Sequence, residues 1–544
     1  MKRAIESALN NILSSLSYPK INVLIQLPKN SKHGDFATNI ALQLGNKMNS
    51  SPKDIAKTLI EHLVLDYSNL IASAEIAGPG FINIKINKDA ISQQLYEVLK
   101  SNKNFGKNSN GNGKKAQVEF VSANPTGPLT VAHGRGAILG DVISSILNWN
   151  GYKVEREYYY NNAGRQMHRL GESVKARYLE LLGEKTSFPD EGYMGEYIIN
   201  IAQKLIDDNG DSLKNNDKNI EIFKSAAESN IFIQIKNTLD RIGLKFDNFF
   251  NENSLYDSGA IDIVVDELKQ KNLIYEKENA TWFRASTVGR EQDRVIIKSS
   301  GEPTYRLPDI AYHKNKFDRN YDLMIDVLGA DHMDAYPDVM AAINQLGCDT
   351  QKIKVVIHQF VTLTEKGSPI KMSTRKAQYI TLDELIDEVG KDVVRYFFIM
   401  RGTNSHLNFD MSLAKEESDE NPVFYLQYAH ARLSNILKHA ESLGFSINNR
   451  TDLSVLTLES EIQLIKLLLE FPSIISKAKD NLEPQTIATY LQTLAGMFHK
   501  YYAKERVVTD NKDKTLARLI LVKSLKIVLS NGLLLLGIDA PDRM

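Results

Sequence analysis

The sequence contains little that would tie the protein to an oxidising compartment or to a membrane. Cysteine occurs once among 544 residues, so no disulfide within the chain and no cluster of thiolate metal ligands can form. We expect no membrane-spanning segment, because no apolar run approaches the required length. Residues 1–16 carry apolar side chains at helical spacing, which predicts an amphipathic helix and not a signal peptide. These absences predict a cytoplasmic protein without a metal site built from its own side chains.

An excess of either charge is also absent. The chain has 66 basic and 67 acidic residues, a formal net charge of −1. Composition therefore gives no sign of nucleic-acid binding, and any polyanion would have to meet local basic patches. The sequence also lacks a GxGxxG motif with a downstream acidic residue, which disfavours a dinucleotide-dependent dehydrogenase.

What is present divides into three parts of different pattern. Residues 101–115, SNKNFGKNSNGNGKK, have the composition of a linker or long loop and separate a first domain, 1–105. That domain has helices and, around a Gly-Pro-Gly turn, two strands. Residues 106–403 alternate strands and helices, which predicts a Rossmann-like parallel sheet with a mostly helical insertion at about 170–270. Residues 404–544 show only helical patterns, which predicts a helical bundle. The predicted fold class is therefore a multidomain chain of α/β and all-α parts, with a small α+β domain first.

Glycines gather where a strand expected over 116–122 passes to a helix expected over 133–149, in the segment NPTGPLTVAHGRG. Ligands of such folds bind beyond the carboxyl ends of the strands, where unpaired N–H groups and the helix dipole favour phosphate. Glycine lets the backbone approach closely, and His133 in the first helical turn could donate a hydrogen bond to a phosphate oxygen. The alternative is a packing junction with a satisfied histidine, and this segment alone does not decide between them.

A basic loop lies in PIKMSTRKAQYITL, just before a helix expected to start near Thr381. Its cations Lys371, Arg375 and Lys376 would suit the charge that develops during adenylyl transfer. The alternative is a solvated basic loop, which is the common meaning of a short charged run.

The glycine-rich junction followed by this loop resembles the class I aminoacyl-tRNA synthetases. Further segments resemble the arginyl-tRNA synthetase family in its order and cover nearly the whole chain: EFVSANPTGPL, YYYNNAGRQM, GYMGEYI, PTYRLPDIAYHKNKF, LGADHMDAY, NPVFYLQYAHAR and GIDAPDRM. The resemblance implies activation of L-arginine with ATP and Mg²⁺ to arginyl-adenylate, then transfer to the 3′-terminal adenosine of tRNA(Arg). It also implies an N-terminal domain that touches the tRNA elbow and a C-terminal domain that binds the anticodon. We expect a monomer.

Three positions depart from the family pattern. Thr130 and Ala132 replace a histidine and a glycine of the nucleotide motif, and Thr374 replaces the second lysine of the loop. These departures motivate an alternative function, a catalytically degenerate, synthetase-like protein that only binds tRNA. An intact arginine pocket argues against it. Arg375 and Lys376 are the candidates to replace the missing lysine.

The resemblance assigns residues to the nucleotide and to catalysis. Implied catalytic residues are His133, Lys371, Arg375 and Lys376. Implied ATP contacts are Pro125, Gly127, Thr130, His133, Gly134, Gly136, Lys371, Met372 and Ser373.

The arginine pocket can also be argued from chemistry. A guanidinium group needs a planar, bidentate acceptor, which is a carboxylate. Tyr305 and Asp309 lie four residues apart and would share one helix face, although Asp309 after a proline could instead be a helix cap. The implied arginine contacts are Glu119, Ser122, Asn124, Gln166, Tyr305, Asp309 and His332. For Ser122 and Asn124 the alternative is turn chemistry beside a proline.

Two segments are candidates for tRNA contact. Tyr425, Tyr428 and Arg432 fall at helical spacing, and aromatic and basic side chains together suit unpaired nucleotides, although such a stripe is commonly core. In the N-terminal domain the resemblance implies His33, Asp35 and Phe36, with an N-cap as the alternative for Asp35.

Overall fold

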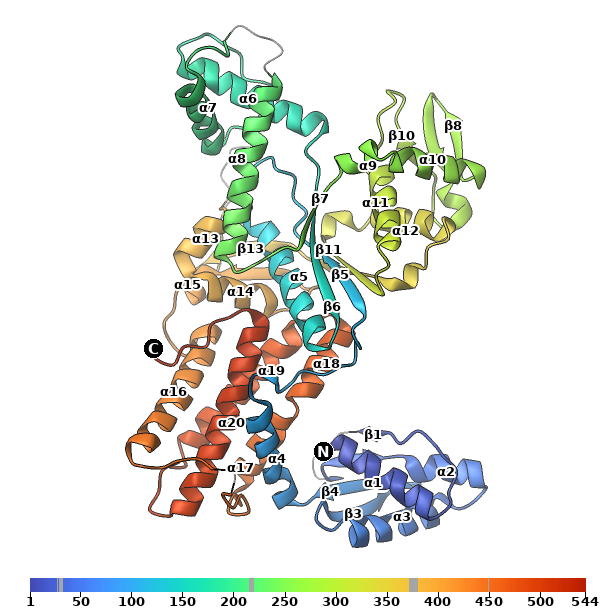
Figure 1. Cartoon of the computed structure of the whole chain (residues 1–544), viewed down its shortest axis with the longest axis vertical. Coiled ribbons are helices and arrows are strands. Elements are labelled where there is room, and N and C mark those ends of the chain that lie inside the picture. Colours follow the sequence, from blue (N-terminus) through green and yellow to red (C-terminus); the bar gives the residue numbers. More distant parts are fainter. Residues whose placement is uncertain (27, 29–32, 215–219, 371–379, 449) are drawn as a thin grey trace.

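The computed structural model describes residues 1–26, 28, 33–214, 220–370, 380–448 and 450–544. A small α+β domain, a central part built on a parallel sheet and a bundle of long helices follow one another along the chain (Figure 1). The predicted fold class is confirmed.

The N-terminal domain packs helices on a four-stranded antiparallel sheet of order β1-β2-β4-β3. The predicted strand pair around the Gly-Pro-Gly turn is present, and Gly80 takes a φ of +145° that disfavours other residues. Its elements are α1 (Lys2–Ser15), β1 (Ile25–Gln26), β2 (Phe36–Thr38), α2 (Ile40–Met48), α3 (Pro52–Asp66), β3 (Ile71–Ala77), β4 (Phe81–Ile86) and α4 (Lys88–Ser101).

The central sheet has five parallel strands in the order β12-β11-β5-β6-β7. Chain order reverses between β5 and β11, and ligands of such folds bind at the carboxyl ends of the strands flanking that point. Helix α5 (Val131–Trp149) connects β5 to β6. The strands are β5 (Lys115–Glu119), β6 (Lys153–Tyr160), β7 (Asn248–Asn251), β11 (Leu323–Gly329) and β12 (Ile353–His358).

Strand β5 ends three residues before the predicted limit of 122. Val121 and Ser122 have φ values of +67° and +44°, which end the extended conformation. A β-branched residue such as valine is rarely found there, so the turn after β5 is strained.

Two units extend from the sheet at the upper end of the molecule in Figure 1. The first is helical: α6 (Gly164–Leu181), α7 (Glu196–Asn209) and α8 (Ile220–Arg241). The predicted insertion of 170–270 also contains β7, which instead pairs with β6 at the sheet edge; its four residues, NFFN, are too few to show an alternating pattern.

The second unit lies between β7 and β11 in sequence and carries a three-stranded antiparallel sheet of order β10-β9-β8. Beyond β10 the chain turns back on itself: Ile297 forms a bridge with Pro303, and the Thr304 N–H donates to the Ile296 carbonyl (2.8 Å). The elements are α9 (Asn253–Asp257), α10 (Ala260–Gln270), β8 (Ile274–Lys277), β9 (Ala280–Phe283), η4 (Ala285–Val288), β10 (Arg294–Ile297) and α11 (Arg306–Asp318), with α12 (Tyr336–Gln345) packed beside α11.

The central part continues past the sheet through a second small sheet of order β14-β13-β15. Strand patterns were expected to vanish from residue 404, but β15 pairs in parallel with β13. The elements are β13 (Val361–Glu365), β14 (Ser368–Pro369), α13 (Leu382–Val389), α14 (Lys391–Ile399), β15 (Leu407–Asp410) and α15 (Met411–Ala414). The helical domain follows with α16 (Pro422–Ser442), α17 (Glu459–Leu469), α18 (Phe471–Asn481), α19 (Gln485–Tyr502) and α20 (Lys512–Leu536).

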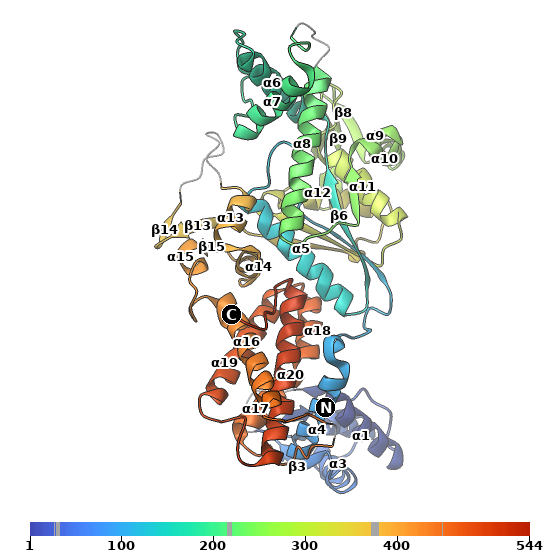
Figure 2. The ribbon, with the colours of Figure 1, turned by 60° about the vertical axis from the view of Figure 1, so that its left-hand side comes forward.

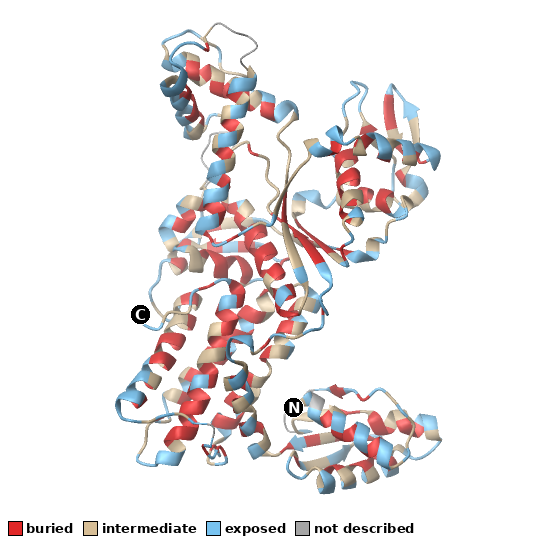
Figure 3. Ribbon diagram, viewed as in Figure 1, coloured by how far each residue is buried: buried red, intermediate tan, exposed pale blue. Residues whose placement is uncertain are grey.

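Helix α20 corrects the expectation that no apolar run approaches membrane-spanning length. It has 25 residues and a mean hydropathy of 1.9 over its most apolar stretch, enough to cross a bilayer by length and composition. However, 78% of that stretch is buried inside the protein, among α16, α19 and α4 (Figure 3). An all-round apolar helix is what the centre of a helical domain requires.

The helical domain lies against the central part (Figure 2), and polar side chains also join the two. The buried guanidinium of Arg395 on α14 donates to the carbonyl oxygens of Ile242 (3.0 Å) and Leu536 (2.9 Å) and to the carboxylate of Asp141 on α5 (2.5 Å). The helical insertion, helix α5 and the helical domain thus meet at one side chain. The linker 101–115 is packed as well, since the carbonyls of Asn102 and Phe105 accept from the Asn531 amide.

Candidate active site

The strained turn after β5 holds a polar group at the carboxyl edge of the sheet. The Ser122 hydroxyl donates to Glu119 Oε1 (2.9 Å) and accepts from the backbone N–H of Tyr159 on β6 (3.2 Å). The neighbouring Asn124 accepts from the Asn161 N–H (3.0 Å) and donates to Gln166 Oε1 (3.2 Å). The structure therefore brings four of the predicted arginine contacts into one hydrogen-bonded region above β5 and β6.

The start of α5 fixes the protonation state of His133. The Thr130 backbone N–H donates to His133 Nδ1 (3.1 Å), so Nδ1 is an acceptor and the proton of the neutral ring sits on Nε2. Burial lowers the pKa of His133, which keeps the ring neutral near pH 7. The Nε2–H group is then available to donate to a ligand at the helix N-terminus.

The glycines of the same helix have packing partners distant in sequence. A Cβ atom at Gly134 would lie 2.8 Å from Leu382 Cδ1, and one at Gly136 would lie 2.8 Å from His358 Nε2. Both positions therefore require glycine for packing, as the alternative interpretation of this junction held. Their contact with ATP stays a prediction, as does that of Gly127, where a Cβ would come 3.1 Å from the Tyr197 hydroxyl, and that of the buried Pro125.

Asp309 has an unbalanced carboxyl group. It lies in the first turn of α11, yet that helix has no side-chain cap, so the alternative role of helix cap finds no support. No hydrogen-bond or ion-pair partner of its carboxylate occurs within the part of the chain that the structure describes. Burial, together with the charges of Glu119 and Glu252, raises the pKa of Asp309 to about 7.

Glu252 is an acidic neighbour that the sequence did not reveal. It follows β7, and its carboxylate accepts from the Tyr159 hydroxyl (2.5 Å) and from Asn161 Nδ2 (2.7 Å). Burial raises the pKa of Glu252. A polar residue directly after a sheet strand would have been the signal, but four residues were too few to identify β7.

Glu119, in contrast, is already paired. The ammonium group of the fully buried Lys316 lies 2.6 Å from both Glu119 Oε2 and Asp326 Oδ1, and Asp326 Oδ2 lies 3.0 Å from His313 Nε2. Glu119 and Asp326 are therefore compensated by direct ion pairs. Among the described residues Asp309 and Glu252 have no such pair, and the charges of His313 and Lys316 offset only part of the rise in the pKa of Asp309. The negative charge of these carboxylates is therefore only partly balanced, and a cationic ligand would balance the rest.

The remaining predicted arginine contacts lie on the surface. The Tyr305 residue is 63% exposed, one turn before Asp309, and the side chain of His332 is 53% exposed, at the end of η5 (Ala330–His332). Neither has a hydrogen bond that would hold its side chain toward the pocket, at least among the described residues.

The basic loop itself, with Lys371, Met372, Ser373, Arg375 and Lys376, lies outside the described residues. Its end is nevertheless anchored at the nucleotide motif. The Leu382 N–H donates to the Leu129 carbonyl (2.8 Å), and the Val131 N–H donates to the Ile380 carbonyl (3.4 Å). The described residues that follow the basic loop therefore pair with the nucleotide motif at the N-terminus of α5.

Comparisons with known proteins cover this whole arrangement. Residues 1–86 match the arginyl-tRNA synthetase N-terminal domain, residues 94–401 the catalytic domain of class I (R) tRNA synthetases, and residues 426–544 the DALR anticodon-binding domain. An arginine–tRNA ligase of Desulfotalea psychrophila is 50% identical over 96% of this chain and 94% of its own. The chain belongs to the arginyl-tRNA synthetase family.

Further relatives agree. An arginine–tRNA ligase of Salinibacter ruber is 46% identical over the full length of both chains. A solved structure from Campylobacter jejuni, provisionally named an arginyl-tRNA synthetase, is 33% identical, with a TM-score of 0.77 over 84% of this chain and all of its own. The predicted family and enzyme class are confirmed: the protein is an arginine–tRNA ligase that uses ATP. The degenerate alternative receives no support from these relatives.

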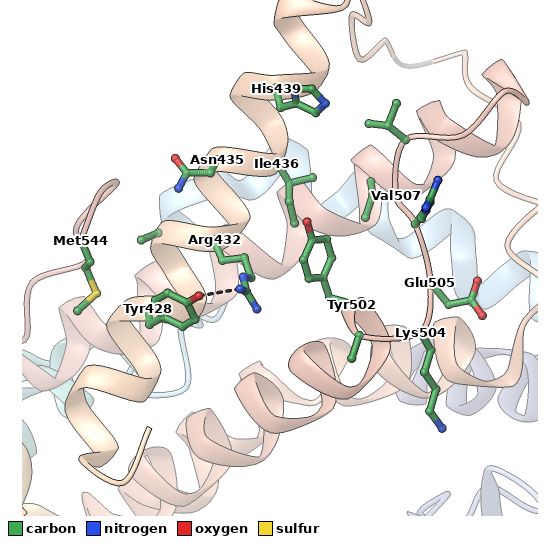
Figure 4. A pocket seen from close by; sticks show the side chains of 14 residues that line it. Tyr428, Arg432, Asn435, Ile436, His439, Tyr502, Lys504, Glu505, Val507 and Met544 are labelled. Atoms are coloured by element: carbon green, nitrogen blue, oxygen red, sulfur yellow. Dashed lines mark hydrogen bonds between the residues drawn. The ribbon is translucent and has the colours of Figure 1, made fainter. Parts of the chain in front are cut away.

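The synthetase's helical domain contains a cavity of about 750 Å³ between α16 and the end of α19 (Figure 4). The Arg432 guanidinium donates to the Tyr428 hydroxyl (2.6 Å) and lies over the Tyr428 and Tyr502 rings, at 4.7 and 5.3 Å from their centroids. Tyr425 does not line this cavity but packs against the ring of His499. Aromatic and basic groups are thus held in place at an open surface.

The three N-terminal candidates have different environments. Asp35 forms an ion pair with Lys466 of α17 and accepts from the Ile86 N–H (2.8 Å), so it joins two domains and caps no helix. Phe36 is partly buried against the domain core, and His33 is exposed. Their contact with tRNA stays a prediction.

Proposed function

We propose that this arginine–tRNA ligase binds L-arginine at the carboxyl edge of β5, with Asp309 as the principal acceptor of the guanidinium group. The observation that carries the proposal is the half-buried Asp309 carboxylate, which has no ion-pair partner in the part of the chain that the structure describes. Glu252 adds a second carboxylate, and Lys316 keeps Glu119 in a fixed position at the pocket wall. A guanidinium group would supply the missing charge and fit a carboxylate in its own plane.

The other end of arginine then faces the nucleotide motif. Ser122 and Asn124, with Gln166, would hold the α-amino and carboxylate groups, so that a carboxylate oxygen attacks the α-phosphate of ATP in line. Catalysis comes from positioning and from charge stabilisation, since no side chain forms a covalent intermediate. His133 would donate through Nε2 to a phosphate oxygen. The cations of the basic loop would neutralise the leaving pyrophosphate.

Magnesium fits this scheme as a companion of ATP. No group of three or more His, Cys, Asp or Glu side chains that could hold a metal occurs in the described ranges of the chain. Mg²⁺ commonly takes few protein ligands and several phosphate oxygens, and there it neutralises phosphate charge. The residues present are compatible with that mode.

For tRNA, we propose that the cavity beside Tyr428, Arg432 and Tyr502 receives unpaired anticodon bases, which stack on aromatic rings while the guanidinium meets phosphate. The N-terminal domain would contact the tRNA elbow through the exposed His33 and its neighbours. We further propose that the enzyme works as a monomer in the cytoplasm, away from membranes.

Amino-acid-dependent exchange of pyrophosphate into ATP tests the proposal. We expect exchange with L-arginine, measured with and without total tRNA, and strong rejection of lysine and citrulline, which would leave the pocket carboxylates badly paired. Charging of tRNA should show the same preference. Equal exchange with lysine would contradict a pocket built for guanidinium, and the absence of any exchange would contradict the proposed reaction.

A further inference from the structure

Three arginines of the second unit converge on one buried carboxylate beside the proposed arginine pocket. Asp338, in the first turn of α12, is 1% exposed. Its Oδ1 lies 2.9 Å from Arg290 Nε, and its Oδ2 lies 2.9 Å from Arg294 Nε and 3.2 Å from Arg306 Nε. Four side chains thus carry three positive charges and one negative charge.

The terminal guanidinium nitrogens of these arginines are not involved in the hydrogen bonds to Asp338. Asp338 holds each guanidinium by Nε, and within the described part of the chain none of the terminal nitrogens of Arg290, Arg294 or Arg306 has a hydrogen-bond or ion-pair partner. The three side chains remain 31%, 25% and 16% exposed. Asp293, the acid next to Arg294 in sequence, is occupied by Ser286 and Tyr275. Asp338 holds each guanidinium group in place through Nε and leaves its two terminal nitrogens available to a second anion. Those two nitrogens can donate a pair of parallel hydrogen bonds, which matches the geometry of phosphate oxygens.

We infer that Arg290, Arg294 and Arg306 form a site for the phosphates of the single-stranded 3′ end of tRNA, with Asp338 as the positioning residue. The inference rests on the proposed function, because it uses the location of the arginine pocket. Arg306 directly follows Tyr305 on α11, and its guanidinium lies over the Tyr305 ring at 5.1 Å. The terminal adenosine must reach the arginyl carbonyl, so the nucleotides before it pass beside this turn of α11.

ATP is a less suitable occupant. In the proposed reaction its phosphates lie at the N-terminus of α5, which follows β5. The arginine cluster is instead built from the loop after η4, from β10 and from the starts of α11 and α12, and Figure 1 shows β10, α11 and α12 in one unit. Three guanidinium groups that come from several elements suit successive phosphodiester groups along a single RNA strand.

The test compares intact tRNA(Arg) with the same tRNA lacking its last three nucleotides, by equilibrium binding at several salt concentrations. The double variant Arg290→Gln/Arg294→Gln leaves Arg306 to pair with Asp338, so that the buried carboxylate keeps a cation. We expect it to bind intact tRNA about tenfold or more weakly, and to lower the salt slope by about 0.7 for each phosphate that the variant no longer neutralises. The double variant and the wild-type enzyme should bind the truncated tRNA with equal affinity.

Two further variants separate this result from a folding defect. Lys298→Gln removes an exposed charge from the loop after β10, where the ion-pair partner of Lys298 among the described residues is Glu302. This variant should bind both intact and truncated tRNA with the affinity of the wild type. Arg290→Lys/Arg294→Lys keeps the charge and should restore part of the affinity that the glutamine variant lacks, because lysine still meets phosphate as a point charge.

Three outcomes would overturn the inference: unchanged affinity for intact tRNA, an equal loss on truncated tRNA, or a raised KM for ATP in place of the tRNA effect. The last would make the cluster an ATP site. A failure of the proposed function is recognised separately, because the wild-type enzyme would then not charge tRNA with arginine at all.

Discussion

At the scale of single residues, the carboxylates of the arginine pocket differ in how their charges are balanced. Glu119 is tied to Lys316, and Asp326 to both Lys316 and His313. Asp309 has a raised pKa and no ion-pair partner among the described residues, although the charges of His313 and Lys316 offset part of the rise. Its electrostatic cost in the free enzyme becomes binding energy when a guanidinium arrives, so substrate specificity depends on a group that the folded protein leaves unsatisfied.

Replacing Asp309 by asparagine tests this role. The change keeps the volume but removes the charge and turns one acceptor oxygen into a donor that faces guanidinium N–H groups. Losing a charged partner in a desolvated site typically costs about 2–5 kcal/mol, or roughly thirty- to several-thousand-fold. We expect kcat/KM for arginine to fall in that range, with ATP binding and tRNA affinity near wild type.

The melting temperature provides the control for this variant. The pKa of Asp309 in the folded protein, about 7, lies above its unfolded value, so ionisation of Asp309 destabilises the fold increasingly as pH rises toward 7. Asp309→Asn removes that effect and should not lower the melting temperature at pH 8. A lower melting temperature with unchanged arginine kinetics would make Asp309 a structural residue.

Arginine affinity should also depend on pH through the same group. Guanidinium requires the carboxylate form, and below a pKa of about 7 the free enzyme holds Asp309 protonated. We expect the dissociation constant for arginine, measured by calorimetry, to rise about tenfold per pH unit below about 7 and to level off above it. The Asp309→Asn variant should lose this dependence. A wild-type profile that is flat from pH 5.5 to 8 would contradict the assignment.

His133 acts through a different chemistry. Its Nδ1 is occupied by the Thr130 N–H, so only Nε2 can serve a ligand. We expect His133→Ala to slow arginine activation by about two to three orders of magnitude, the usual effect of removing one preorganised donor, with arginine affinity little changed. Because the ring also completes the cap of α5, the melting temperature should be measured as well. A variant with normal activation and only a lower melting temperature would leave His133 a packing residue.

At the scale of elements, what the sequence could predict depended on how many residues carried a pattern. Residues 131–149 are long enough to show their period, and α5 begins two residues before the predicted bounds of 133–149 and ends with them. Strands β7 and β15 have four residues each and were missed, and with β7 the sequence also failed to reveal Glu252. A packing role for Gly134 was foreseen as an alternative, but its partner was not, because Leu382 lies far along the chain. Short strands and distant contacts leave no local pattern.

The basic loop is the element on which the departures from the family pattern bear most directly. If Arg375 and Lys376 replace the lysine missing at Thr374, neutralising both should slow pyrophosphate exchange more than neutralising either, because each supplies charge to the same developing anion. Thr374→Lys should be tolerated. Full activity of the double variant would mean that the compensating cation lies elsewhere, and Lys371 would be examined next.

At the scale of the whole molecule, the charges that matter for tRNA are local. The chain is almost neutral overall, yet Arg432 stands beside aromatic rings in the helical domain and three arginines share one carboxylate in the second unit. Net charge could not have revealed either patch. In the N-terminal domain Asp35 is paired with Lys466, so this acid holds domains together and does not repel the phosphate backbone.

The contacts of Arg395 have a consequence for how the molecule melts. Its hydrogen bonds join α5, the end of α8 and the end of α20. If any one of these helices unfolded alone, the buried charge of Arg395 or Asp141 would lose hydrogen-bond partners. Removing one partner of a buried ion pair costs about 3–5 kcal/mol.

We expect scanning calorimetry to record a single endotherm for the central part and the helical domain together, because neither can lose structure without the other. The part of the N-terminal domain before α4 should give a smaller, separate endotherm, since α4 itself packs on α17 and α20 and the Asp35–Lys466 ion pair is peripheral. Arg395→Lys should divide the large endotherm into two, whereas an undivided peak would mean that apolar packing alone makes these parts one cooperative unit.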